Sequence, residues 1–220
     1  MKYLIEYKNK SKEYFFFERA EMLQFLPKEA DRILDVGCGA GSFGLLIKKS
    51  FPKKEVWGIE PDLASFQIAS TRLDNTINSL FNNEVLEKIG KQKFDLIFFN
   101  DVLEHMLDPQ DALLLCKKIL NQGGFIVASI PNFLFIENLH ELIVKKDWEY
   151  KDAGILDKTH LRFFTRKSMI RLFSENGYEV LQVEGINTIK NRYLRMINFF
   201  SIKQYTEFAF QQFVLVSKIK

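Results

Sequence analysis

Three glycines after a short apolar run most constrain the fold of this chain. The run Arg32–Val36 (RILDV) reads as a buried strand, and Gly37, Gly39 and Gly41 separate it from a helical stretch at 42–50. A sharp turn from strand to helix needs backbone conformations that glycine adopts without steric cost, and it also lets the backbone approach a ligand closely. The pattern therefore predicts a ligand-binding unit of one strand and one helix.

The same alternation continues along the chain. Further strands are expected at 55–59, 94–99, 125–130, 178–183 and 212–218, and further helices at 61–80, 108–120 and 165–176. Ser42 and Thr165 are expected to cap the helices that they begin, and Gly123 and Gly124 to end the helix from 108. Strands that alternate with helices pair in parallel through right-handed crossovers. We therefore expect an open, doubly wound α/β sheet, which binds ligands at the carboxyl ends of its strands.

Composition and charge narrow the class of protein. The 220 residues, 47% of them apolar, suit one hydrophobic core, so we expect a single domain over 1–220. Lysine and arginine exceed aspartate and glutamate by 31 − 28 = 3, without a basic arm or tail, so nucleic acid is not an expected partner. No apolar run approaches the roughly 20 residues of a transmembrane helix. Two cysteines, Cys38 and Cys116, are too few for a disulfide framework, which favours the cytoplasm.

An acidic residue at the end of the second strand indicates a nucleoside ligand. Glu60 lies about 20 residues beyond the glycines, where a carboxylate accepts hydrogen bonds from both hydroxyls of a ribose. The dinucleotide pattern G-x-G-x-x-G would need glycine at position 42, where Ser42 stands. Asp35 would repel a pyrophosphate, whereas it suits the cationic amino group and sulfonium of S-adenosylmethionine. These features favour S-adenosylmethionine, with a nicotinamide-dependent oxidoreductase on a similar fold as the alternative.

The sequence resembles the class I S-adenosylmethionine-dependent methyltransferases. The resemblance rests on ILDVGCGAG, on the strand ending in Glu60, and on FDLIFFNDVLEHMLDP leading into GGFIVASIPN, and it covers roughly residues 18 to 185. It implies a Rossmann-like, mostly parallel sheet of seven strands with an antiparallel final strand. It places Asn83 where the family usually has an aspartate for the adenine amino group, and Pro61 or Leu63 against one face of the adenine. The residues expected to bind the cofactor are Asp35, Gly37, Cys38, Gly39, Gly41, Glu60, Pro61, Asn83 and Asn100.

The segment 100–105 (NDVLEH) looks like the corresponding segment of ubiquinone-pathway O-methyltransferases. In that group the positions matching Asp101, Glu104 and His105 are implicated in holding a divalent cation. Glu104 and His105 equally suit a support for the next helix, and we expect no metal at this point. A hydroxyl acceptor must lose a proton, and histidine is suited to take it at neutral pH. The expected catalytic residues are therefore His105, His160 and Asp101.

A second segment, 154–165 (GILDKTHLRFFT), is similar to one in methyltransferases associated with surface-glycan biosynthesis. If it is extended, His160 and Arg162 point the same way and line an acceptor pocket. The alternative is that Asp157, His160 and Arg162 form a local charge network that pins the loop. The sequence leaves these two readings open.

Two lid insertions, at 132–165 and 187–210, are expected on the acceptor side. An N-terminal helical segment is expected at about 1–30. The basic, aromatic stretch 190–210 fits a lid or a peripheral membrane contact, although a surface helix with a buried aromatic face is favoured. The acceptor is expected to be a small molecule, including sugar or lipid-linked compounds, with O-methylation as the reaction. A non-catalytic module that binds S-adenosylmethionine is a further alternative, and the oligomeric state is left open.

Overall fold

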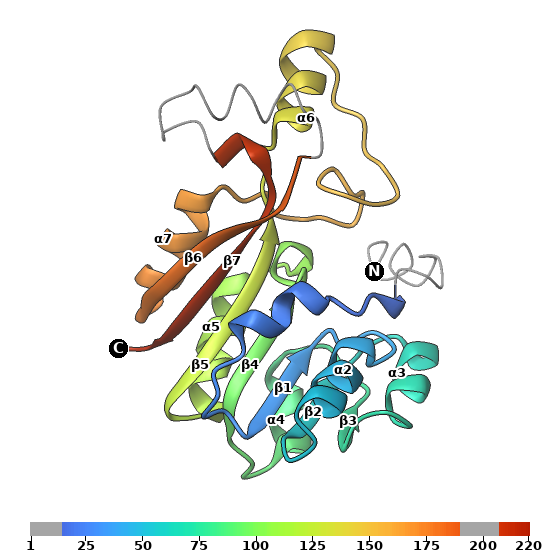
Figure 1. Ribbon diagram of the computed structural model, residues 1–220, viewed down its shortest axis with the longest axis vertical. Coiled ribbons are helices and arrows are strands. Elements are labelled where there is room, and N and C mark those ends of the chain that lie inside the picture. The colour runs from blue at the N-terminus through green and yellow to red at the C-terminus, as the bar shows by residue number, and fades with distance from the viewer. Residues whose placement is uncertain (1–14, 190–206) are drawn as a thin grey trace.

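The computed structural model describes residues 15–189 and 207–220, and seven strands of this part form one sheet. The strand order is β3-β2-β1-β4-β5-β7-β6 (Figure 1). Strands β1 to β5 are parallel, and β7 runs antiparallel to both β5 and β6. The predicted mostly parallel sheet with an antiparallel final strand is confirmed. The strands are β1 (Arg32–Val36), β2 (Glu55–Ile59), β3 (Asn75–Ile77), β4 (Phe94–Asn100), β5 (Leu120–Pro131), β6 (Tyr178–Thr188) and β7 (Phe210–Ile219).

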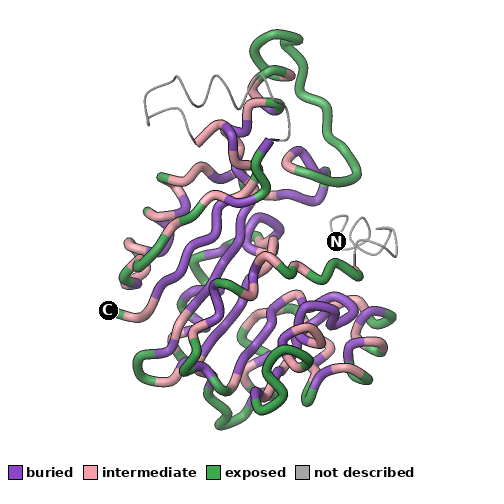
Figure 2. Tube along the Cα trace, viewed as in Figure 1, coloured by how far each residue is buried: buried purple, intermediate pink, exposed green. Residues whose placement is uncertain are grey.

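Helices cover both faces of the sheet, as a doubly wound fold requires (Figures 1 and 2). The described α-helices are α2 (Ser42–Ser50), α3 (Leu63–Ala69), α4 (Asn83–Ile89), α5 (Pro109–Ile119), α6 (Ile136–Leu139) and α7 (Arg166–Glu175). The shorter turns are η2 (Ala20–Phe25), η3 (Leu103–His105) and η4 (His140–Lys145). One apolar cluster joins the sheet to α4, α5 and α7, and a second joins it to η2, α2 and α3.

Strand β4 shows why the central strands are continuous apolar runs. Leu96 and Phe98 pack into the cluster around α2, whereas Ile97 and Phe99 pack into the cluster around α5. Successive side chains of a strand point to opposite faces, so both sets must be apolar when helices cover both faces. The strand ends at the polar residue Asn100, at its carboxyl end.

The helix starts at Asp108 and Thr165 were predicted correctly. The Asp108 side chain accepts hydrogen bonds from the backbone N–H groups of Gln110 and Asp111, and Pro109 is the first residue of α5. Thr165 and Ser168 form a reciprocal capping box at the start of α7. These caps fix where the two helices begin.

Three predictions of secondary structure were wrong, and one helix was missed. The helix expected over 61–80 ends at Ala69, and a turn then leads into β3. Its apolar spacing is shared between α3, the turn and β3, which a single periodicity cannot separate. Gly41, with φ 75°, occupies the cap position expected for Ser42, and α4 was not anticipated. Strand β5 already begins at Leu120, so the Gly123–Gly124 pair lies inside it.

The expected insertions are described in part. Segment 132–165 contains α6 and η4 and lies beyond the carboxyl end of β5, at the top of Figure 1. In the N-terminal segment, residues 15–30 contribute the 3-10 helix η2. Most of 187–210, including the expected lid or membrane contact, lies outside the described residues. Among residues 15–189 and 207–220, no helix is long and apolar enough to cross a membrane.

Replacing Tyr178 with phenylalanine is expected to lower the free energy of unfolding by about 0.5 to 1.5 kcal/mol, the usual net value of one hydrogen bond. The fully buried Tyr178 hydroxyl donates to the carbonyl oxygen of Leu113 at 2.7 Å, tying β6 to α5. Urea denaturation of both proteins measures the difference. An unchanged midpoint with an unchanged slope would contradict the prediction.

Candidate functional site

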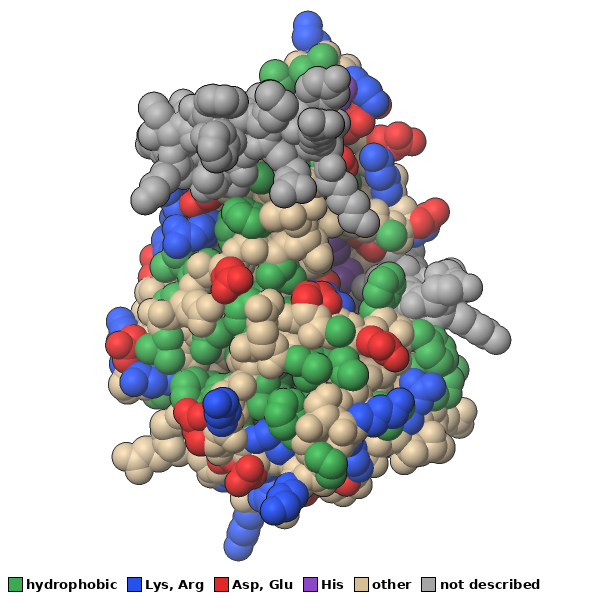
Figure 3. Space-filling model, viewed as in Figure 1, with side chains coloured by type: hydrophobic (Ala, Val, Ile, Leu, Met, Phe, Trp, Pro, Cys, Tyr) green, Lys and Arg blue, Asp and Glu red, His purple; other side chains and the backbone are tan. Residues whose placement is uncertain are grey.

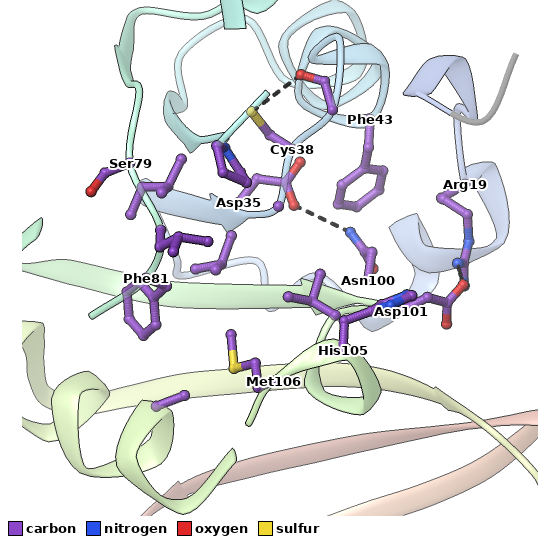
Figure 4. Close-up of a pocket in the computed structure, with 18 of the residues that line it drawn as sticks. Arg19, Asp35, Cys38, Phe43, Ser79, Phe81, Asn100, Asp101, His105 and Met106 are labelled. Carbon is purple, nitrogen blue, oxygen red and sulfur yellow. Dashed lines mark hydrogen bonds and ion pairs between the residues drawn. The ribbon is translucent and has the colours of Figure 1, made fainter. Parts of the chain in front are cut away.

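A cavity of about 1010 Å³ opens at the carboxyl ends of β1 and β4 (Figure 4). Its volume lies at the upper end of the range for ligand pockets, large enough for a nucleoside and a second molecule. Most of the residues proposed from the sequence meet here. The predicted residues that line the cavity are Asp35, Gly37, Cys38, Gly39, Pro61, Asn83, Asn100, Asp101 and His105, whereas Gly41, Glu60 and His160 do not line it.

Asp35, which is buried, and Asn100, which is partly buried, lie next to each other in the lining of this cavity. Asp35 is 2% exposed, and the Asn100 side-chain amide donates to its Oδ1 at 3.4 Å. Burial raises the pKa of Asp35 to about 7, opposed by the hydrogen bond from Asn100 and reinforced by the negative charge of Glu60. The other amide atom, Asn100 Oδ1, is buried and accepts no hydrogen bond from the described residues. A buried carboxyl group beside an unsatisfied amide oxygen forms a site for a cationic donor.

The glycine loop lies against this pair. Gly37 and Gly39 have φ values of 71° and 53°, which favour glycine. A Cβ atom at Gly37 would lie 2.7 Å from Val102 Cγ2, and one at Gly39 would lie 2.8 Å from the backbone oxygen of Phe15. Gly41, at the start of α2, instead packs closely on Ala69 of α3. It allows these two helices to approach each other and does not line the cavity.

Glu60 lies behind the glycine loop. It is fully buried, and its two carboxylate oxygens accept hydrogen bonds from the backbone N–H groups of Gly39, at 2.9 Å, and of Asp62, at 2.8 Å. It therefore ties the end of β2 to the loop after β1. The sequence predicted a ribose contact for Glu60, and this support of the loop was missed. Its carboxylate must turn toward the cavity to meet a ribose, and that contact stays a prediction.

Arg19 is a cavity residue that sequence reasoning missed. Its guanidinium binds the carboxylate of Asp101 and donates to Ser129 Oγ at 3.1 Å, and its Nε donates to Glu21 at 2.7 Å. Gln212 also donates to Asp101, at 2.9 Å. No motif surrounds Arg19, and 82 residues separate it from Asp101, so no local signal pointed to it. The positive charge of Arg19 balances the negative charge of Asp101, the third expected catalytic residue. The same hydrogen bonds hold the segment before η2 against the ends of β4 and β5.

Glu104, His105 and His160 meet in a buried cluster beside the cavity. The two imidazole rings lie 4.6 Å apart, and Glu104 Oε1 is 3.9 Å from Nε2 of His160. Glu104 is 1% exposed, and neither of its carboxylate oxygens accepts a hydrogen bond from the described part of the chain. Burial, with the negative charge of Asp101, raises the pKa of Glu104 well above its ordinary value.

Segment 154–165 is held in place by its backbone. The carbonyl oxygen of Glu104 accepts from the N–H groups of Leu161, at 2.8 Å, and Arg162, at 3.0 Å. His160 turns inward to Glu104, whereas the Arg162 side chain donates to the carbonyl oxygen of Leu107 at 2.7 Å. Neither side chain is among those that line the cavity, which favours the reading in which these residues hold the segment in place. These backbone contacts with Glu104 set the course of the segment.

Comparison with solved structures shows the fold of known methyltransferases. An S-adenosylmethionine-dependent methyltransferase from Archaeoglobus fulgidus superposes with a TM-score of 0.65 at 20% identity, covering 98% of this chain and 97% of the other. The plantazolicin methyltransferase BpumL, in complex with S-adenosylhomocysteine and a desmethyl plantazolicin analogue, superposes with a TM-score of 0.59 at 17% identity, covering 100% and 90%.

Sequence relatives agree with this fold. A ubiquinone biosynthesis O-methyltransferase from Alkalilimnicola ehrlichii is 30% identical over 138 residues, which are 55% of this chain and 54% of that protein. An uncharacterized methyltransferase from Schizosaccharomyces pombe is 32% identical over 123 residues, 51% of this chain and 44% of that protein. The chain thus spans about half the length of these curated relatives. A family model described as a methyltransferase domain matches residues 9–183, and the chain belongs to this family.

Proposed function

We propose that this chain is an S-adenosylmethionine-dependent methyltransferase that methylates a hydroxyl group of a small-molecule acceptor. The observation that carries the proposal is the pair of Asp35, which is buried, and Asn100, whose buried Oδ1 accepts no hydrogen bond from the described residues, in the lining of the cavity. The amino group of S-adenosylmethionine would satisfy both the carboxylate and the free amide oxygen. The flanking turn of Gly37 and Gly39 lines the same cavity, beside the place proposed for the methionine half of the donor.

The charge of this site separates S-adenosylmethionine from a nicotinamide dinucleotide. A pyrophosphate would bring two negative charges toward the buried Asp35, and the buried charge of Glu60 lies close enough to raise the pKa of Asp35 further. A ligand with an ammonium and a sulfonium is instead attracted by both groups. The geometry therefore favours a methyltransferase over the oxidoreductase alternative.

The acceptor side of the cavity favours a hydroxyl acceptor. Methyl transfer from a sulfonium is an in-line displacement, and the protein lowers its barrier mainly by aligning the reactants and excluding water. A hydroxyl must also lose its proton, and His105 lies on the cavity wall with Glu104 and His160 behind it. We assign activation of the hydroxyl to this cluster and not to Asp101, whose carboxylate is bound by Arg19. The likeness to ubiquinone biosynthesis O-methyltransferases supports the same chemistry.

Calorimetry and a methyl-transfer assay test the proposal together. Purified protein is titrated with S-adenosylmethionine, S-adenosylhomocysteine and NADH, and is then assayed with labelled donor on phenols, sugars and lipid-linked sugars. We expect binding of the two sulfur nucleosides, no binding of NADH, and labelled ether product on one acceptor class. Binding of NADH alone would favour the oxidoreductase. Donor binding without transfer to any acceptor would favour a non-catalytic module.

Replacing Glu60 with alanine is expected to weaken S-adenosylmethionine binding by roughly 1.5 to 3 kcal/mol, as expected for hydrogen bonds to a charged group. The variant loses the predicted ribose contact as well as the support that Glu60 gives to the N–H groups of Gly39 and Asp62. Calorimetric titration of both proteins measures the change. A comparison of S-adenosylmethionine with free methionine separates the two causes, because only the nucleoside carries a ribose. An unchanged dissociation constant would contradict both roles.

A further inference from the structure

We infer that Glu104, His105 and His160 form a binding site for one divalent transition-metal ion such as Zn²⁺. One ligand atom from each residue lies within 4.8 Å of the other two, and all three residues are buried. Two imidazoles and one carboxylate are a donor set that zinc and neighbouring metals accept, and such sets leave a coordination position open. Histidine atoms are visible in a recess in the middle of the face drawn in Figure 3.

The hydrogen bonds of the two histidines prepare them for this role. His105 Nδ1 lies 3.1 Å from the carbonyl oxygen of Thr159, and His160 Nδ1 lies 2.9 Å from that of Ile155. A carbonyl oxygen only accepts, so each Nδ1 carries a proton, and in the neutral ring Nε2 is then the nitrogen that can bind a metal ion. Metal-binding histidines are commonly oriented in this way, by donating their other ring nitrogen to a backbone carbonyl.

Glu104 supplies the second, independent observation. Its carboxylate is buried beside both rings, yet neither oxygen accepts a hydrogen bond from the described residues. Leaving such a group unsatisfied costs several times more than an ordinary hydrogen bond contributes, so buried carboxylates normally have donors or coordinate a metal. A cation between Glu104 and the two histidines would satisfy both oxygens.

This set differs from the one that the resemblance implied, because Asp101 is not part of it. The carboxylate of Asp101 already accepts hydrogen bonds from Arg19, Ser129 and Gln212. In the proposed set His160 replaces Asp101. His160 lies 55 residues after His105 in the sequence. The ion would join η3 to segment 154–165, next to the wall that His105 contributes to the cavity. When bound, it would lower the pKa of a hydroxyl group that reached its open position.

Metal titrations test the inference without an acceptor or a methyl donor. The full chain is stripped with a chelator and titrated with Zn²⁺ by calorimetry and with Co²⁺ by visible absorption, which reports the ligand geometry. We expect one ion per chain, a rise in the melting temperature with added Zn²⁺, and reversal by the chelator. Wild-type protein that binds neither ion, or binds without a Co²⁺ ligand-field band, would overturn the inference.

Four variants locate the site. His160→Asn keeps a donor to Ile155 and removes Nε2, and Glu104→Gln keeps the side-chain shape and removes the charge. Each is expected to weaken metal binding by more than about 100-fold, since even outer-sphere partners of ligands contribute 10- to 100-fold. His140→Asn changes the remaining histidine of the chain, on the surface, and Asp101→Asn changes the excluded carboxylate. Both controls are expected to bind metal like the wild type.

The controls also define how the inference fails. If His140→Asn lost as much metal affinity as the ligand variants, the ion would be an adventitious surface ion. If Asp101→Asn lost as much, the ligands would be Asp101, Glu104 and His105, the set that the resemblance implies. Circular dichroism checks folding, and Glu104→Gln carries the test if His160→Asn does not fold. The cluster is the one used in the proposed function, but the readouts are separate. Methyl transfer by a protein that binds no metal would overturn this inference and leave the proposed function in place.

Discussion

Replacing Asp35 with asparagine is expected to weaken S-adenosylmethionine binding by about 2 to 5 kcal/mol, which is about 30-fold to 5,000-fold in the dissociation constant. The donor's amino group would lose its buried carboxylate partner while the shape of the site stays the same. Asp35 is 2% exposed, so bulk water cannot replace the lost interaction. Calorimetric titration with S-adenosylmethionine at pH 8, where Asp35 is ionised, measures the change.

The matched control is Asp111→Asn. Asp111 also lines the cavity but is exposed, so its charge is screened and little change in affinity is expected. Stability provides a second control. The pKa of Asp35 in the folded protein, about 7, lies above its ordinary value of 3.8, so the ionised carboxyl group lowers stability as the pH rises through that range. Asp35→Asn should therefore be at least as stable as the wild type at pH 8, which separates lost binding from unfolding.

The affinity for S-adenosylmethionine should also depend on pH. Below pH 7 the free protein holds Asp35 protonated, and the neutral carboxyl group cannot pair with the ammonium. Binding then requires loss of a proton, so affinity should fall about tenfold per pH unit below pH 7 and level off above it. The profile of Asp35→Asn should be flat over the same range. A steep profile in the variant would assign the dependence to another group.

Replacing His105 with asparagine is expected to lower the rate of methyl transfer by about 10²- to 10⁴-fold while leaving the affinity for S-adenosylmethionine nearly unchanged. Asparagine can keep the hydrogen bond to the carbonyl oxygen of Thr159 but lacks the second ring nitrogen, Nε2. The loss is expected whether Nε2 takes the proton itself or holds a cation. Single-turnover transfer of a labelled methyl group, with the donor saturating, measures the chemical step.

The control for this variant is His140→Asn, because His140 lies on the surface of η4 and away from the cavity lining. Its rate should match that of the wild type. A His105→Asn rate within threefold of the wild type would remove the cluster from the mechanism. Equal losses in rate and in donor affinity would instead indicate a role in shaping the site.

Local patterns in the sequence determined most of the sheet and the donor side of the site. Strands β1, β2 and β4, and the second half of β5, are short apolar runs. The turn at Gly37 and Gly39 lies between a strand and a helix. Both signals are contained in a few neighbouring residues. Asp35 was identifiable by its place beside that turn. The boundary between α3 and β3 was not, because one apolar spacing fits both elements.

Tertiary structure alone decided the acceptor side. Arg19 reaches Asp101 across 82 positions of the chain, and His160 reaches the Glu104 and His105 pair across more than 50. The support that Glu60 gives to the N–H of Gly39 depends on β2 lying beside β1 in the sheet. Local periodicity carries no information about which distant side chains share a buried volume. In this protein the sequence by itself determined the sheet and the residues around Asp35, whereas packing between distant segments decided the partners of Asp101, Glu104 and His160.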